Sequence, residues 1–211
     1  PLGRDERLAH PEGAPGGDPP LYSPVRRQTH ETLLALLDHT GVEPAAFPAA
    51  DIGAGIRCLA YRLAQRGHPI LALDGSLDPD FGLGVSGAYV SACRPRLLPV
   101  CADLDLLPLR PGALALVLFN VSLHHATDVG QTLGRVAAAL APGGHLLILD
   151  TPIYRQPLYG AAEGEQRLGR GELIAELNAA GLEPRVVSIC RSLRWSAYQG
   201  SHVLRGRSPF S

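Results

Sequence analysis

Residues 49–74 read AADIGAGIRCLAYRLAQRGHPILALD, and this stretch decides the fold. A short apolar segment ends in Asp51-Ile52-Gly53, a helical pattern runs from about Ile56 to Arg66, and Gly67 ends that helix. A second apolar segment, residues 69–74, then predicts another strand. A strand, a turn, a helix and a strand in this order predict a parallel βαβ unit.

The same alternation continues along the chain. After an irregular glycine-rich stretch, residues 96–101 predict a third strand, and residues 113–119 predict a fourth that is apolar on both faces, as a central parallel strand must be. Asp128 can cap a helix before Pro142-Gly143-Gly144, which turns the chain into a fifth strand over residues 145–150. We therefore expect an α/β, doubly wound sheet.

Both ends of the chain depart from this pattern. Residues 1–20 are rich in glycine and proline and predict a flexible arm, followed by a single domain over residues 21–211. That domain should begin with a helix at Ser23-Pro24. Residues 184–190 and 201–205 are strand candidates with no helix between them. They predict an antiparallel C-terminal edge hairpin, which would complete a mainly parallel, seven-stranded sheet.

Composition excludes several classes of chemistry and of partner. All 19 basic residues are arginine, so Schiff-base lysines, phosphate-loop lysines, kinase lysines and Tyr/Lys dehydrogenase pairs are excluded. The net charge is −1, and the five arginines of residues 184–211 fit a charged sheet edge better than a nucleic-acid surface. No apolar run has the length of a membrane span, and the four cysteines form no C-x-x-C pair. We expect a cytoplasmic protein without a membrane or metal partner.

Polar residues come directly after the first four predicted strands. These residues are Asp51 with Gly53 and Gly55, then Asp74, Asp103 and Asn120. In a doubly wound sheet, ligands bind at the carboxyl ends of the strands, where glycines let the backbone approach the ligand closely. Asp74 lies 23 residues beyond Asp51, a position from which its carboxylate can accept hydrogen bonds from two ribose hydroxyls.

Over roughly residues 30–206 the chain resembles class I S-adenosylmethionine-dependent methyltransferases, which have a Rossmann-like fold. The motifs that carry the resemblance are Asp51-Ile52-Gly53-Ala54-Gly55, Asp74, Ala102-Asp103, Asn120 and Pro142-Gly143-Gly144. The resemblance implies S-adenosyl-L-methionine as cofactor. Its methionine part would lie beside Asp51, Gly53 and Gly55, its ribose beside Asp74 and Gly75, its adenine beside Asp103 and Leu104, and its sulfonium beside Asn120.

Arg57 departs from the family pattern, which has a third glycine at this position. The nicotinamide fingerprint fails as well, because Cys58 occupies its last position. Arg57 either points outward from the first helical turn or pairs with the carboxylate of the cofactor. A noncatalytic S-adenosylmethionine-binding or regulatory protein therefore stays an alternative, as does an RNA methyltransferase.

The expected reaction is in-line displacement of the methyl group by a small-molecule acceptor, whose nucleophile can be oxygen, nitrogen or carbon. A general base is optional, and His124 or His125, just after the fourth strand, could serve. The alternative for either histidine is packing under the loop or simple exposure. Tyr22, Arg26, Tyr154 and Arg155 are candidates to hold an anionic group of the acceptor, and their alternative is surface cover. Oligomeric state is not indicated.

Overall fold

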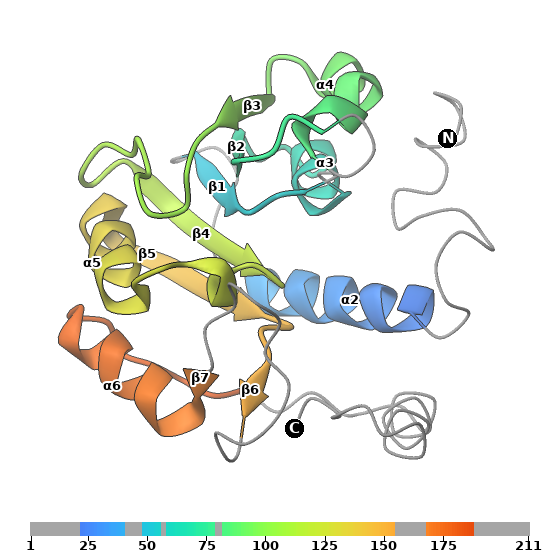
Figure 1. Ribbon diagram of the computed structural model, residues 1–211. Coiled ribbons are helices and arrows are strands. Elements are labelled where there is room, and N and C mark those ends of the chain that lie inside the picture. The colour runs from blue at the N-terminus through green and yellow to red at the C-terminus, as the bar shows by residue number, and fades with distance from the viewer. Residues whose placement is uncertain (1–21, 41–47, 56–57, 79–81, 155–167, 188–211) are drawn as a thin grey trace.

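The structure, a computed structural model, describes residues 22–40, 48–55, 58–78, 82–154 and 168–187. Its centre is a five-stranded sheet of order β3-β2-β1-β4-β5 in which every pair of neighbouring strands is parallel (Figure 1). The strands are β1 (Ala49–Ile52), β2 (Ile70–Asp74), β3 (Leu97–Cys101), β4 (Leu114–Asn120) and β5 (Leu140–Leu149). The strand order reverses between β1 and β4, as the doubly wound prediction requires.

Helices cover both faces of this sheet. They are α2 (Tyr22–Thr40), α3 (Cys58–Gln65), α4 (Gly87–Cys93), α5 (Val129–Ala139) and α6 (Arg170–Ala179). Core residues of α2, α3 and α4 pack on one face, whereas those of α5 and α6 pack on the other. Figure 1 shows α5 beside α6, and α3 beside α4. A small parallel pair, β6 (Ile153–Tyr154) and β7 (Leu168–Gly169), lies before α6.

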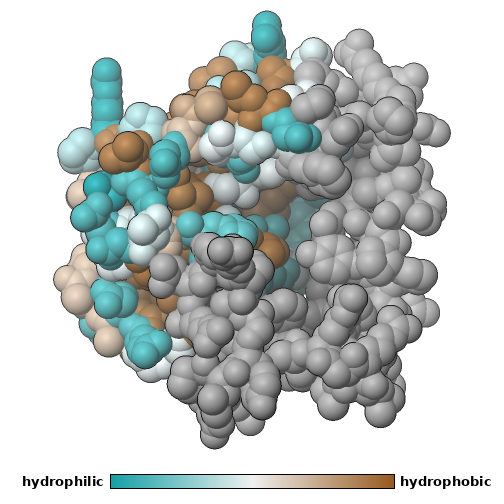
Figure 2. Space-filling view, in the orientation of Figure 1, coloured by the Kyte–Doolittle hydropathy of each residue, from teal (hydrophilic) through white to brown (hydrophobic). Residues whose placement is uncertain are grey.

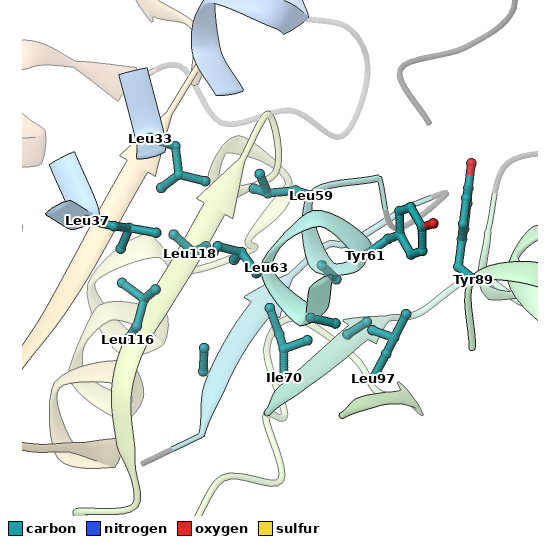
Figure 3. Packing of buried hydrophobic residues seen from close by; sticks show 14 of the residues in the cluster. Leu33, Leu37, Leu59, Tyr61, Leu63, Ile70, Tyr89, Leu97, Leu116 and Leu118 are labelled. Atoms are coloured by element: carbon teal, nitrogen blue, oxygen red, sulfur yellow. The ribbon is translucent and has the colours of Figure 1, made fainter. Parts of the chain in front are cut away.

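The alternation of side chains along β4 connects the two cores. Leu116 and Leu118 face the cluster that contains α2 and α3, while Val117 and Phe119 face the cluster that contains α5. All four side chains are fully buried. Figure 3 shows Leu33 of α2 near Leu118. Burial on both faces is why this strand is a continuous apolar run, and it holds the carboxyl end of β4 rigidly against its neighbours.

Most of the predicted elements are confirmed within a few residues. Asp128 accepts a hydrogen bond from the Gln131 N–H at 2.9 Å and caps α5, as predicted. The glycine-rich stretch before β3 contains α4, which the sequence did not indicate. Pro142-Gly143-Gly144 lies inside β5 as a break in pairing, since Leu114 pairs with Leu140 but Leu116 pairs with His145. The turn is therefore a bulge within one strand rather than its beginning.

The C-terminal hairpin and the seven-stranded sheet stay predictions. Of the first predicted hairpin strand, residues 184–187 are described, and they form no strand. Val186 and Val187 are more than half exposed there. The remaining hairpin residues lie outside the described residues, as do residues 1–20 of the expected arm. The sheet in the described part of the chain has five strands, all parallel.

The described surface mixes polar and apolar side chains. Figure 2 shows apolar residues in brown near the top of the molecule, where Figure 1 places β3 and α4. Leu98 of β3, at the sheet edge, is 51% exposed. Within the described ranges, no helix combines the length and the apolar character needed to cross a membrane.

Candidate functional site

The carboxyl ends of the strands converge on one cavity of about 560 Å³. The strand register explains this convergence. Ile52, the last residue of β1, pairs with Leu73 of β2 and with Phe119 of β4, so the three strands end side by side. The cavity is lined by Gly53, Gly55, Asp74, Gly75, Cys101, Asp103, Leu104, Val121, Ser122 and His125. Its volume is within the range of about 300–1,000 Å³ that is usual for small-molecule sites.

Asp74 holds the glycine turn that forms one wall of this cavity. One carboxylate oxygen, Oδ2, accepts the Gly55 N–H at 2.7 Å, and the other accepts the Ser76 N–H at 2.8 Å. The N–H groups of Gly53 and Ala54 both donate to the Leu73 carbonyl, at 2.8 and 2.9 Å. Each carboxylate oxygen retains a further lone pair, so Asp74 can also accept hydrogen bonds from a ligand's hydroxyl groups.

Position 53 must be a glycine because the loop after β4 passes directly against it. Its φ of 72° lies in the left-handed region, and a Cβ built there would overlap Cβ of Ser122. Ser122 is buried, and its hydroxyl donates to the Ile52 carbonyl at 2.5 Å. The turn after β1 and the loop after β4 are therefore locked together at a point where no side chain fits.

Asp51 lies behind the turn and outside the cavity lining. It is only 2% exposed, and this burial raises the pKa of its carboxyl to about 7. A hydrogen bond from the Ala60 backbone acts in the opposite direction, whereas the charge of Asp74 raises the pKa further. Asp51 thus lies in the core behind the glycine turn, and its place beside the methionine part of the cofactor stays a prediction.

The two histidines have different places in the loop after β4. Residues Leu123–His125 form one turn of 3-10 helix, in which His124 is buried and His125 is exposed and lines the cavity. Their ring centroids lie 4.0 Å apart at an interplanar angle of 42°. Only His125 is thus placed to reach a molecule bound in the cavity. The ring of His124 packs against it.

Asn120, at the end of β4, is half-buried and outside the cavity lining. Among the described residues, no hydrogen-bond partner reaches its buried Oδ1. A buried polar atom without a partner costs roughly 1–3 kcal/mol, which a donor group from a bound molecule would offset. Within the lining itself, the turn without a Cβ at Gly53 and the carboxylate of Asp74 fit a ligand with polar groups on its edge.

The opposite wall comes from the loop between β3 and β4. Asp103 is exposed and Leu104 is half-buried, and both line the cavity, while their contact with an adenine ring stays a prediction. A Cβ at Gly53 would lie 3.6 Å from Leu104 Cδ1, so the apolar side chain closes against the glycine turn. The predicted residues Gly53, Gly55, Asp74, Gly75, Asp103 and Leu104 are therefore brought together in one lining.

Other predicted residues lie wholly or partly outside the described residues. Tyr22 and Arg26 belong to α2, and Tyr154 belongs to β6, but their side chains are outside the described part of the chain. Arg155 and Arg57 lie entirely outside it. The acceptor-binding role of the first four and the role of Arg57 therefore stay predictions.

Sequence reasoning missed Cys101, Val121 and Ser122. Val121 has a φ of 57° and is 38% exposed, and a β-branched residue adopts such a φ only under the constraint of its surroundings. The contact of Ser122 with Gly53 joins segments about 70 residues apart, and no local pattern signals it. In the ranges that the structure covers, no cluster of three or more His, Cys, Asp or Glu side chains is placed to hold a metal ion.

Comparison with known proteins identifies the domain. Residues 50–148 match the family model described as a methyltransferase domain, and this range contains the entire cavity lining. These residues therefore form a methyltransferase domain, and solved structures with a Rossmann-like fold superpose on it.

Relatives of this methyltransferase domain agree in fold. The chain is 32% identical over 141 residues, 67% of its length, to a malonyl-[acyl-carrier protein] O-methyltransferase of Geobacter sulfurreducens, of which it covers 51%. It thus spans about half the length of the curated relatives it matches. An S-adenosylmethionine-dependent methyltransferase from Mesorhizobium loti superposes with a TM-score of 0.60 at 20% identity, covering 85% of this chain and 93% of that one. The [4+2]-cyclase SpnF superposes with a TM-score of 0.57 at 18% identity, over 72% and 56% of the chains.

Gly53→Ala should lower both stability and cofactor affinity, because it adds a strained φ and a clash with Ser122. Gly112→Ala is the matched control, since Gly112 has a φ of 64° with open space around it. We expect the control to lose about 1–2 kcal/mol of unfolding free energy from left-handed strain alone, and Gly53→Ala to lose more. Urea unfolding and calorimetry with S-adenosylhomocysteine measure the two effects. Equal losses for both variants, with equal affinity, would contradict the close approach.

Asp51→Asn should remove a pH dependence of stability. The folded pKa of about 7 lies above the unfolded value, so the folded chain takes up a proton, and the stability that Asp51 contributes is lost as pH rises from about 4 through 7. The free energy of unfolding of the wild-type chain, relative to the variant, should fall by about 2–4 kcal/mol over this range. Urea unfolding at pH 4.5, 6.0 and 7.5 measures it. Parallel profiles would show that Asp51 titrates normally.

Proposed function

We propose that this chain transfers the methyl group of S-adenosylmethionine to a small-molecule acceptor by in-line displacement. The observation that carries the proposal is the single cavity in which the glycine turn, Asp74 and the loop after β4 meet. The bound cofactor supplies a methyl carbon already activated by a positively charged sulfur. The protein's task is then to align the acceptor with that carbon and to exclude water.

The two walls of the cavity suit different parts of the cofactor. Asp74 offers carboxylate oxygens to two neighbouring hydroxyl groups, while Leu104 offers an apolar surface to a flat ring and Asp103 an acceptor to its edge. Asn120 has a buried oxygen without a partner in the described structure, on the β4 side where the resemblance puts the sulfonium. These features support the assignment of Gly53, Gly55 and Gly75 to the cofactor shell as well.

Asp74→Ala should weaken binding of S-adenosylhomocysteine by about 1.5–3 kcal/mol, since hydrogen bonds to an ionised group are the strong ones. The matched control is Glu183→Ala, which removes an exposed carboxylate outside the cavity lining. Isothermal calorimetry at constant salt gives both dissociation constants. Because Asp74 also holds the Gly55 N–H, thermal unfolding is recorded in parallel. An unchanged affinity in the folded variant would refute the ribose assignment.

A noncatalytic cofactor-binding protein is the second candidate. The observation that favours it is Arg57, which stands where the family pattern has a third glycine. Binding of S-adenosylhomocysteine without methyl transfer to any acceptor would support this candidate.

The name of the relative from Geobacter sulfurreducens suggests a second class of acceptor, a carboxylate oxygen of a malonyl group carried on an acyl-carrier protein. An ionised carboxylate is already a nucleophile at neutral pH, so it requires no base. A hydroxyl or amine acceptor would require one, and His125 is the candidate because it lines the cavity. Tyr22, Arg26, Tyr154 and Arg155 stay candidates for holding the acceptor's anionic group.

His125→Ala distinguishes these acceptor classes. With malonyl-[acyl-carrier protein] as acceptor, we expect turnover within a few-fold of wild type, because no proton has to be removed. With a hydroxyl or amine acceptor, loss of the base should lower kcat by about 10²-fold or more. Methyl transfer is followed by mass spectrometry, with affinity for S-adenosylhomocysteine as the control that the cavity is intact. A loss of about 10²-fold on the malonyl acceptor would contradict the carboxylate proposal.

A further inference from the structure

The acidic residue Asp105 lies outside the cavity lining but is bonded to both loops that form it. It comes after Asp103 and Leu104 on the β3–β4 loop. Both of its carboxylate oxygens accept the Thr127 N–H, at 3.0 and 3.2 Å, although Thr127 lies 22 residues away on the loop after β4. The Thr132 hydroxyl, on the first turns of α5, adds a contact at 3.4 Å.

The same residue also shapes its own loop. The Asp105 N–H donates to Oδ1 of Asp103 at 2.8 Å, and the Leu106 N–H donates to the Asp103 carbonyl at 3.1 Å. These bonds hold residues 103–106 in a tight turn that begins at Asp103. A continuous series of hydrogen bonds therefore runs from Asp103 through Asp105 to Thr127.

The carboxylate of Asp105 is ionised at neutral pH. The side-chain hydrogen bond of Thr127 is the largest cause that holds its pKa below the ordinary value, and backbone N–H groups of Thr127 and Asp128 act in the same direction. These N–H groups belong to the start of α5, where the positive end of the helix dipole also favours a negative charge. The contact thus favours the ionised carboxylate.

We propose that Asp105 is a positioning residue for cofactor binding, because it ties the wall formed by Asp103 and Leu104 to the wall formed by Ser122 and His125. The proposal rests on the proposed function, since it concerns the same cavity. Without the tie, Leu104 loses its fixed distance from the glycine turn, and the cofactor must order the loop when it binds. Asp105 itself makes no contact with the ligand in this proposal.

The test is Asp105→Asn, which keeps the shape of the side chain but removes its charge and replaces one of the two oxygens that accept the Thr127 N–H by an N–H₂ group. The matched control is Glu172→Gln. Glu172 is an exposed carboxylate that likewise accepts a backbone N–H at a helix start, from Gly169 at 3.0 Å, but it lies outside the cavity lining. Both variants should lower Tm slightly. Only Asp105→Asn should raise the dissociation constant of S-adenosylhomocysteine, by about 5- to 30-fold.

Thr132→Val supplies a second measurement, and its effect in the wild-type background does not depend on the folding of Asp105→Asn. Thr132 is fully buried and outside the lining, and its hydroxyl contacts Asp105, so we expect its effect on binding to pass through Asp105. In the wild-type background we expect Thr132→Val to weaken the affinity for S-adenosylhomocysteine by about two- to five-fold. In the Asp105→Asn background we expect no further loss, because residues of one hydrogen-bond network are not additive. A loss of equal size in both backgrounds would overturn the proposal.

The remaining outcomes separate the two proposals. If the wild-type chain binds S-adenosylhomocysteine and Asp105→Asn binds it within about two-fold, the positioning role is overturned while the proposed function stands. If Glu172→Gln weakens binding as much as Asp105→Asn, general destabilisation explains the effect and the positioning role is again overturned. If the wild-type chain does not bind S-adenosylhomocysteine at all, the proposed function fails and the positioning role fails with it.

Discussion

The hydrogen bond from the Gly55 N–H to the Asp74 carboxylate is the interaction on which the rest of the site depends. The backbone after β1 has left the sheet, and the carboxylate at the end of β2 provides the partner that its N–H groups need. A charge-assisted bond of this kind is worth about 1.5–3 kcal/mol. On the other side of the turn, Ser122 can approach because Gly53 has no Cβ, and its hydroxyl satisfies the Ile52 carbonyl. Parallel pairing thus brings the ends of β2, β1 and β4 to one edge, and these two contacts shape it.

Local pattern and sheet topology make part of this arrangement predictable from the sequence. The apolar run of β4, the Asp128 cap and the polar residues at the strand ends are recognisable because each depends on neighbours in sequence or on the rule for parallel sheets. Ser122 and Asp105 are not recognisable, because their partners lie 70 and 22 residues away. Only the three-dimensional packing of the loops defines them.

The sequence shows two aspartates and two histidines near the site, and burial decides which member of each pair faces the cavity. Asp51 and Asp74 are both aspartates at the ends of neighbouring strands, yet Asp51 is buried and Asp74 faces the cavity. His124 and His125 are adjacent, yet a turn of 3-10 helix directs one into the core and the other toward the ligand. A pattern of residue types gives the chemistry available at a position. The surrounding packing decides whether water or a ligand can reach it.

The two ends of the cavity are held by different kinds of bond, and this difference separates cofactor recognition from acceptor recognition. The glycine turn is fixed by backbone N–H groups that donate to Leu73 and Asp74, within the sheet itself. The loop that carries His125 depends on side-chain bonds to its neighbours, such as those of Ser122 and Asp105. Substitutions in that loop that leave the contacts of Ser122 and Asp105 intact can change the acceptor without disturbing the turn. Proteins of this fold can therefore keep the glycine turn that faces the cofactor while the loop after β4, and with it the reaction, diverges.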